Sequence, residues 1–335
     1  MKRILIVTIS ITVLVFLVAV SWAKSPKTKK PVYKFHMALA FPAEETPRYS
    51  GAVHFAEEVE KRTGGQVNIK LSPVGEIVTI PEAIPALKAG TIEILVFANA
   101  FYLGETWAAY WNMVPGLCEN YKFAETEEKS GVFDLLRGDL RKAGLEMLGN
   151  YEVGAADVFI AKKHHFTVPQ DLKGLKIRGF GGPHDRSFAD FGAKAVTLPM
   201  DELYMALQTG VADGAFTALP AYEGFRWYEV APKVTYIPSM PFGFNITFNK
   251  KVWDGLSADI QSAIRAAMKD TQSWILPEKR AYYAAAFPRL IGLGVDFKVP
   301  PIDAWTDDYG LVVRKHYRKM GGDAAKKVLE LLGKE

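Results

Sequence analysis

This chain of 335 residues has almost no cysteine and none of the common catalytic motifs. Cys118 is its single cysteine, so no disulfide can form within one molecule and stability must come from packing. The neighbours of Cys118 match no catalytic cysteine motif, which favours a small core residue. The chain also lacks the motifs of serine hydrolases, P-loop nucleotide-binding proteins and zinc proteases. These absences argue against an enzyme, although a secreted hydrolase or lyase stays open as an alternative.

The chain has no large excess of positive or negative charge either. The formal net charge is +4, and it falls to +2 without Lys2 and Arg3. This balance gives no reason to expect nucleic acid or an anionic membrane as a partner. The histidines show no metal-ligand spacing, and His164 and His165 follow two lysines in a segment typical of an exposed turn. The sequence therefore predicts neither a metal nor a cofactor.

The longest apolar run lies at the N-terminus. Ile4–Val20 follows the basic pair Lys2 and Arg3 and is followed by Ser21–Ala23, a small-x-small cleavage site. This layout predicts a signal peptide over residues 1–23 and export from the cytoplasm. An uncleaved membrane anchor is the alternative, because about 17 apolar residues approach the lower limit of a span. The basic residues 24–30 predict a flexible leader.

Apolar periodicity in the rest of the chain predicts an α/β fold. Near the start, strands at 32–39, 66–71 and 92–98 alternate with helices at 47–62 and 81–89. This alternation indicates parallel strands with helices on the faces of the sheet. Later helices are predicted at 124–143, 183–191, 201–209, 221–229, 257–289, 302–320 and 324–332. Later strands are predicted at 146–151, 155–161, 176–178, 242–249 and 295–299. The helix at 257–289 is very long, and Pro277 is a point where it could kink or divide.

The most specific stretch of the sequence is Asp171–Arg178, followed by Phe191–Ala193 and Pro199–Gly214. Their order and spacing resemble the solute-binding proteins of TRAP transporters, the tripartite periplasmic systems that import organic acids. The resemblance extends from Tyr33 to about Leu332 and is looser in the N-terminal half. It implies an α/β periplasmic binding protein fold with two lobes and a cleft between them. It also implies strands that cross between the lobes and a long helix that spans both.

The resemblance gives provisional lobe boundaries and a function. Lobe 1 is expected to comprise residues 31–152 and 241–274, and lobe 2 residues 153–240 and 275–335. The implied function is a periplasmic receptor that delivers a small organic acid to the large and small membrane subunits of a permease. A receptor that docks to a signalling protein instead is the second alternative.

Arg178 is the principal candidate for binding the ligand. Leu175 and Ile177 suggest a buried strand, and an arginine at the end of such a strand needs a partner. From the residues alone, an ion pair with a protein carboxylate is as good an explanation as a ligand. The resemblance favours a ligand carboxylate, to which a planar guanidinium donates two parallel hydrogen bonds. The loop Gly179–Gly182 that follows predicts a backbone that passes close to another group.

The resemblance implies further ligand-binding positions, carried across one by one. These are Asn99 and Tyr102 after the strand at 92–98, Met200, and Phe216 and Thr217 after Asp213–Gly214. An apolar wall is expected from the aromatic residues nearby together with Met200, and three or four of these should reach the cleft. They are Tyr102, Trp107, Tyr110, Trp111, Met200, Phe216, Phe242 and Phe244.

Two departures from the family pattern narrow the expected ligand. Members that bind sialic acid carry a second arginine at a place that falls near Asp157–Phe159 in this chain, which has none there. Members that hold a metal ion in the cleft use an acidic-aromatic pair where this chain has Phe216 and Thr217. Neither sialic acid nor bound sodium is therefore expected. One arginine with aromatic walls predicts an aromatic or bulky apolar acid that bears one carboxylate.

Overall fold

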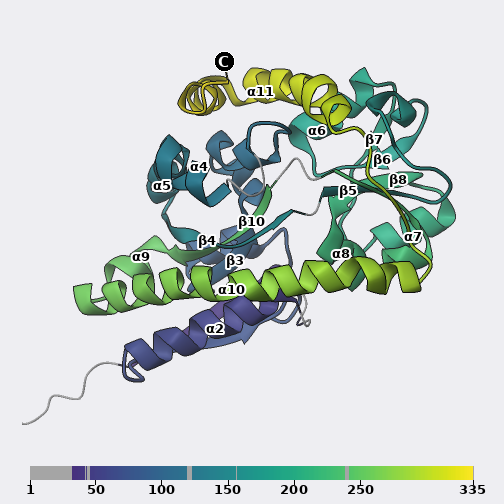
Figure 1. Ribbon diagram of the computed structural model, residues 1–335. Coiled ribbons are helices and arrows are strands. Elements are labelled where there is room, and N and C mark those ends of the chain that lie inside the picture. Colours follow the sequence, from purple (N-terminus) through teal and green to yellow (C-terminus); the bar gives the residue numbers. More distant parts are fainter. Residues whose placement is uncertain are drawn as a thin grey trace, which may run out of the picture. The chain divides into compact units, whose positions relative to one another are not determined.

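The computed structural model describes residues 32–41, 43, 46–118, 123–155, 157–237 and 241–334. Figure 1 shows their arrangement and labels the main elements. The predicted signal peptide, residues 1–23, and leader, residues 24–30, lie outside the described residues. None of the helices formed by the described residues combines the length and apolar character that a membrane crossing requires.

The first of two sheets has five strands in the order β2-β1-β3-β10-β4. The strands are β1 (Tyr33–Leu39), β2 (Val67–Ser72), β3 (Ile94–Ala98), β4 (Leu145–Ala155) and β10 (Pro241–Asn249). β1 and β3 are parallel, whereas β10 runs antiparallel to both β3 and β4. The strand predicted at 242–249 therefore does return to the first sheet, where it lies between two strands from earlier in the chain.

Short helices follow the strands of the first sheet. They are α2 (Pro47–Arg62), α3 (Ala83–Ala89), η2 (Asn99–Gly104), η3 (Trp107–Met113), α4 (Phe123–Ser130), α5 (Val132–Lys142) and α9 (Lys250–Asp254). α2 begins where predicted, because the Thr46 side chain caps the N–H of Tyr49 and Pro47 occupies the first turn. The single helix predicted at 124–143 was wrong. Gly131, at φ 76°, separates α4 from α5, since a left-handed residue cannot continue a right-handed helix.

The second sheet has six strands in the order β11-β9-β5-β8-β6-β7. They are β5 (Asp157–Ala161), β6 (Lys176–Arg178), β7 (Lys194–Val196), β8 (Gly214–Ala218), β9 (Lys233–Tyr236) and β11 (Asp296–Lys298). β6 lies between β7 and β8 and is parallel to both. The chain passes from the first sheet to the second between β4 and β5 and returns between β9 and β10. This gives the predicted crossings, while the lobe boundaries given above stay a prediction.

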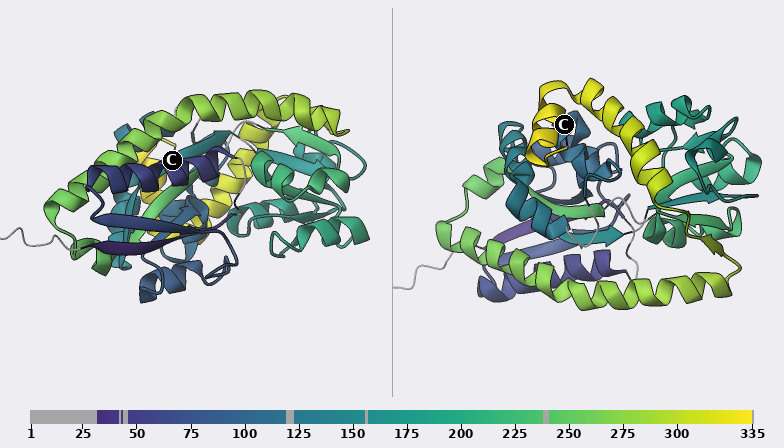
Figure 2. Two further views of the ribbon diagram at one scale, coloured as in Figure 1. Left: turned by 90° about the horizontal axis from the view of Figure 1, so that it is seen from below. Right: turned by 45° about the horizontal axis from the view of Figure 1, so that its top comes forward.

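The helical segments of the second half connect these strands and close the chain. They are η5 (Pro169–Leu172), α6 (Gly182–Asp190), α7 (Leu203–Thr209), α8 (Leu219–Gly224), η6 (Trp227–Glu229), α10 (Ala258–Gly292), the π-helical turn η7 (Ala304–Tyr309) and α11 (Gly310–Leu331). α10 is the predicted long helix, and it stays helical through Pro277 and Pro288. It packs on α2 and β4 and continues past the second sheet, as both views in Figure 2 show.

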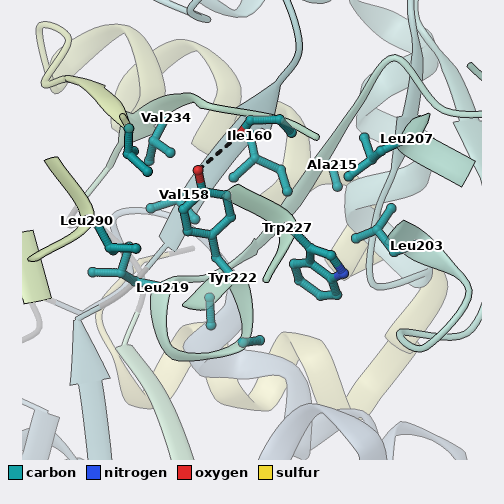
Figure 3. Packing of buried hydrophobic residues seen from close by; sticks show 14 of the residues in the cluster. Val158, Ile160, Leu203, Leu207, Ala215, Leu219, Tyr222, Trp227, Val234 and Leu290 are labelled. Atoms are coloured by element: carbon teal, nitrogen blue, oxygen red, sulfur yellow. Dashed lines mark hydrogen bonds between the residues drawn. The ribbon is translucent and has the colours of Figure 1, made fainter. Parts of the chain in front are cut away.

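Apolar side chains from β5, β8 and β9 form the core beneath the second sheet, together with residues of α7 and α8 (Figure 3). Val158, Ile160 and Val234 are fully buried there, and Leu290 reaches the same cluster from α10. The Tyr222 hydroxyl donates a hydrogen bond to the carbonyl of Ala231, 3.0 Å away, so its polar atom is satisfied inside the core. This core packs on β8, which carries Thr217 and pairs with β6, the strand that ends in Arg178.

Candidate functional site

A pocket lies between residues of the first sheet and residues of the second sheet. It is small, with a volume of about 40 Å³. From the first-sheet side it is lined by Ala40, Phe41, Arg48, Ile80, Phe101 and Phe244. From the second-sheet side it is lined by Phe180, Met200, Thr217, Ala218, Pro220, Ala221 and Phe225. The lining is therefore mostly aromatic and aliphatic, with few polar groups.

The first-sheet wall is an aromatic pair with an arginine stacked on it. Phe41 follows β1 and Phe244 lies on β10, and their rings meet edge to face with centroids 5.5 Å apart. The guanidinium carbon of Arg48 lies 3.9 Å from the centre of the Phe244 ring and 5.4 Å from that of Phe41. Both distances are within the range of a cation–π contact. Arg48 is half-buried and belongs to the first turn of α2.

Arg178 stands at the end of β6 on the second-sheet side. It is buried, with 6% of its surface exposed. Its Nε donates a long hydrogen bond of 3.4 Å to the carbonyl of Leu198, and its Nη1 has no hydrogen-bond partner among the described residues. The guanidinium carbon is 5.4 Å from the centre of the Phe180 ring, which lines the pocket. Arg178 thus lies directly behind the pocket wall, next to residues that form it.

The charge of Arg178 is not neutralised by a close carboxylate of the described residues. Burial lowers the pKa of Arg178 to about 10, and the negative charge of Asp185 opposes this shift. At neutral pH the guanidinium therefore keeps its proton. Burial raises the pKa of Asp185, although a hydrogen bond of 3.0 Å from the N–H of Gly181 opposes that. A buried cation with an unused donor is costly unless an anion binds it.

The glycine loop after β6 passes close to the side chain of Asp185. A Cβ added at Gly179 would lie 2.1 Å from an Asp185 oxygen, so only glycine fits there. The Tyr110 hydroxyl donates to the carbonyl of Gly181 at 3.1 Å, which ties the loop to η3. The close approach predicted for this loop is thus explained by a protein carboxylate that fastens it. The loop in turn sets the position of Phe180 beside Arg178.

Thr217 and Phe216 lie on opposite faces of β8, as neighbours on a strand do. Thr217 lines the pocket, and its hydroxyl is buried without a hydrogen-bond partner among the described residues. Phe216 is fully buried and packs against Phe159 and His184, with centroid distances of 4.8 and 5.0 Å. Its ring also meets that of Phe180 edge to face at 5.4 Å. Phe216 therefore supports a residue of the wall and is not itself among the lining residues.

Of the other predicted site residues, some line the pocket and some do not. Met200 and Phe244 line the pocket. Asn99 and Tyr102 are fully buried in η2 and are not among the lining residues. The side-chain oxygen of Asn99 accepts a 2.9 Å hydrogen bond from Asn245, whereas its amide nitrogen has no partner among the described residues. Contact of Asn99, Tyr102 and Phe216 with ligand stays a prediction. The side chain of Phe242 lies outside the described residues.

Arg48 is the charged lining residue that the sequence analysis missed. One feature that sets it apart is its place in the first turn of a helix, where the dipole disfavours a cation and the first turn itself contains no acidic residue. Phe101 and Phe180 were missed because each follows a strand by two or three residues, and the direction of a loop side chain has no period. No group of three or more metal-ligating side chains is found in the part of the chain that the structure describes.

A family model for bacterial extracellular solute-binding proteins, family 7, matches residues 39–319. The chain belongs to this family. Its members are the receptors of TRAP transporters, so the resemblance drawn from Asp171–Gly214 is confirmed. The C4-dicarboxylate-binding periplasmic protein DctP of Rhodobacter capsulatus is 27% identical over 237 residues, which are 69% of this chain and 70% of that protein.

Solved structures of TRAP solute-binding proteins share the fold of this family member. One from Sulfitobacter sp. NAS-14.1 with bound β-D-galacturonate has a TM-score of 0.82 at 22% identity and covers 90% of this chain and 99% of that one. One from Desulfovibrio salexigens with bound orotic acid has a TM-score of 0.82 at 23% identity and covers 90% and 97%. The α/β two-lobed fold predicted from the sequence is therefore confirmed. TRAP solute-binding proteins are periplasmic receptors that bind substrates rather than enzymes.

Proposed function

We propose that this chain is the periplasmic receptor of a TRAP-type importer and binds a small organic acid in the pocket between its two sheets. The observation that carries the proposal is the buried guanidinium of Arg178. It stays charged at neutral pH, its Nη1 has no hydrogen-bond partner among the described residues, and it lies near the Phe180 ring, which lines the pocket. A carboxylate would accept two hydrogen bonds from it and would neutralise the charge.

The walls of the pocket favour an acid with a bulky apolar or aromatic body. Phe41, Phe180 and Phe225 offer rings for stacking, and Thr217 offers a buried hydroxyl. A sugar acid would need partners for many hydroxyl groups, and this lining contains few polar atoms. The amide of Asn99 would then orient a second polar group of the ligand from behind the wall. The R. capsulatus relative is named as a C4-dicarboxylate-binding protein, which supports an acid in general.

Delivery to a permease follows from the family. In the proposed cycle the protein is exported by its N-terminal segment, closes around the acid by a hinge motion between its lobes, and docks to the large and small membrane subunits. The crossings β4 to β5 and β9 to β10 are the places where such a hinge would act. Lobe 1 would comprise residues 31–152 and 241–274, and lobe 2 the remainder from residue 153.

Binding and closure can both be measured on the purified mature protein. A thermal-shift panel of aromatic acids, short keto acids, C4-diacids and sugar acids should show a raised melting temperature with at least one carboxylic acid. An acid at 100 times its dissociation constant stabilises the folded state by about 2.7 kcal/mol. The corresponding amides serve as controls and should give no shift. Small-angle scattering should show a smaller radius of gyration at saturation. An unchanged scattering curve, or no shift with any acid, would contradict the receptor proposal.

A further inference from the structure

Phe180 lies at the pocket surface beside the buried guanidinium of Arg178. Phe180 is among the residues that line the pocket, whereas Arg178 is not. The guanidinium carbon of Arg178 lies 5.4 Å from the centre of the Phe180 ring, and only 6% of the Arg178 surface is exposed. An acid in the pocket would therefore contact the Phe180 ring, while the guanidinium stays behind the wall.

The pocket is also too small to hold an organic acid in this arrangement. Its volume is about 40 Å³, whereas pockets for small molecules usually measure roughly 300–1,000 Å³. A hinge motion between the lobes would move the first-sheet wall away and enlarge the space. It would not uncover Arg178, because Phe180 follows Arg178 by two residues and would move with it. Access to the guanidinium therefore needs a movement within the second-sheet side itself.

Two buried polar groups on the second-sheet side lack hydrogen-bond partners among the described residues. They are Nη1 of Arg178 and the hydroxyl of Thr217. Arg178 pairs with Ala215 where β6 meets β8, so Arg178 and Thr217 lie on the same face of the sheet. Buried polar groups of this kind are costly unless a partner reaches them. This face of the sheet is therefore suited to an anionic acceptor that the Phe180 ring keeps away from Arg178.

The loop that carries Phe180 combines backbone freedom with two hydrogen bonds at a single residue. Apart from Phe180, the loop Gly179–Gly182 consists of glycine, and Gly181 has a φ of 83°. Glycine on both sides of a residue gives the backbone access to conformations that other residues disfavour. The N–H of Gly181 donates a hydrogen bond of 3.0 Å to Asp185, and its carbonyl accepts one of 3.1 Å from the Tyr110 hydroxyl. These two bonds hold the loop in place.

We propose that Phe180 is a gate over Arg178, held shut by the two hydrogen bonds of Gly181. When these bonds break, the glycine loop swings and the ring leaves the guanidinium, so that a carboxylate from the pocket can reach Arg178 and Thr217. For the identity of the cargo this inference rests on the proposed function, and it adds a step to the hinge motion. Phe180 thereby controls how fast an acid associates.

Chemical modification of arginine tests the gate without any acid. Butanedione reacts with guanidinium groups that it can reach, and mass spectrometry of the peptides gives the rate at each arginine. Phe180→Ala and Phe180→Leu remove or shrink the gate. Phe101→Ala is the matched control, because Phe101 is another half-buried phenylalanine of the lining but belongs to the first-sheet side. The exposed Arg280 on α10 is the reference arginine within each sample.

A second pair of variants tests the bonds that hold the loop. Tyr110→Phe removes the hydroxyl that donates to Gly181 and keeps the ring. Tyr317→Phe is its control, because the Tyr317 hydroxyl also donates to a backbone carbonyl, that of Trp107 at 3.0 Å, and not to the loop. Melting temperatures verify that each variant is folded.

In wild type we expect Arg178 to react at least about 10-fold more slowly than Arg280, because the open loop is a minor population. Phe180→Ala should raise the rate at Arg178 by at least about 10-fold, and Phe180→Leu by less. Tyr110→Phe should raise it by about three- to tenfold, since one of the two bonds that hold the loop is lost. Both control variants should leave it unchanged.

An unchanged Arg178 rate in Phe180→Ala, or an equal rise in Phe101→Ala, would overturn the gate. If Phe180→Ala does not fold, Tyr110→Phe against Tyr317→Phe decides in the same way. The thermal-shift panel judges the receptor function separately. Failure of the gate would therefore leave the receptor function standing, and an absence of binding in the panel would not alter the modification rates.

Discussion

The two walls of the pocket hold their arginines in different ways. Arg178 ends a strand, is buried, and has a pKa lowered to about 10 by loss of water. Arg48 lies in the first turn of a helix, is half-buried, and has its guanidinium carbon 3.9 Å from the centre of the Phe244 ring. A desolvated cation gains more from a bound anion than a solvated one, because nearby water no longer competes. If an acid binds in this pocket as proposed, we therefore expect the buried Arg178 to contribute more to its affinity than the half-buried Arg48.

The largest expected effect comes from replacing the buried arginine, Arg178. Arg178→Lys should weaken binding of any carboxylate by about 2–5 kcal/mol, roughly 30- to 5,000-fold, because lysine cannot donate two parallel hydrogen bonds. Calorimetry with the best acid from the panel measures the loss. Arg280→Lys, at an exposed site, is the control and should bind as wild type does. If Arg178→Lys bound within twofold of wild type, Arg178 would not be the anchor.

A second prediction compares how the two sheets respond to acid. Glu146, on β4 of the first sheet, accepts hydrogen bonds of 2.6 and 2.8 Å from Arg141 and 2.8 Å from Arg265. Burial alone would raise the pKa of Glu146, but these arginines lower it to about 2. His184, beside the second sheet, is fully buried, and burial lowers its pKa to about 4. Its ring nitrogens contact Tyr309 at 2.7 Å and Met113 at 2.6 Å.

Both groups bind a proton less readily in the folded protein than in the unfolded chain. The stabilisation from neutral His184 is therefore complete above the ordinary pKa of 6.5 and is lost as the pH falls toward 4. That from ionised Glu146 is complete above 4.5 and is lost as the pH falls toward 2. Each contributes on the order of 2–3 kcal/mol. Urea unfolding gives the free energy of unfolding at each pH. In His184→Gln this free energy should fall less steeply between pH 6.5 and 4 than in wild type, and in Glu146→Gln less steeply between pH 4.5 and 2.

The control for these slopes is Gln170→Asn, at an exposed residue without a titratable group. It should leave the pH dependence of the free energy of unfolding unchanged. Equal slopes in wild type and His184→Gln would mean that the folded protein protonates His184 as readily as the unfolded chain does. The contacts of His184 with Met113 and Tyr309 would then not depend on its neutral form.

The smallest expected effect concerns two threonine hydroxyls, that of Thr217 at the pocket and that of Thr235 in the second sheet. The Thr217 hydroxyl lines the pocket without a partner among the described residues, whereas the Thr235 hydroxyl accepts a 2.8 Å hydrogen bond from the N–H of Phe166. Thr217→Val should weaken the ligand by about 0.5–1.5 kcal/mol and leave stability nearly unchanged. Thr235→Val should lower the free energy of unfolding by about 1–3 kcal/mol and leave affinity unchanged. Urea unfolding and calorimetry of both variants decide, and the reverse pattern would place the ligand away from β8.

The elements with strong local signals could be predicted from the sequence. Pro47–Arg62 has the predicted bounds because cap, proline and apolar spacing agree there. Lys176–Arg178 was also placed correctly. The break at Gly131 was missed because the apolar spacing looks the same on both sides of it. A single glycine in such a run is compatible with either a helix interior or a helix end.

The site itself could be predicted only in part. Thr217, Met200 and Phe244 were predicted to bind the ligand; all three line the pocket, and their contact with a ligand stays a prediction. Arg48 could not be placed there, because its proximity to β8 and β6 depends on how the crossing strands set one sheet against the other. No periodicity within α2 contains that information. The side-chain directions of residues just after a strand, such as Asn99 and Tyr102, are equally difficult to predict. Here a short 3₁₀ helix turns both side chains into the protein interior.

Pro277 affects how easily the long helix α10 can bend. Before Pro277 the helix is fastened to the first sheet, where Gln272 donates 2.7 Å to the carbonyl of Asn150. After Pro277 it is fastened to the second sheet side, where Tyr282 and Arg289 both donate to Glu223 at 2.8 Å. A proline removes one rung of the helix ladder and lowers the local resistance to bending. If the lobes close by the proposed hinge motion, the part of α10 around Pro277, between these two attachments, is where the helix would bend most easily.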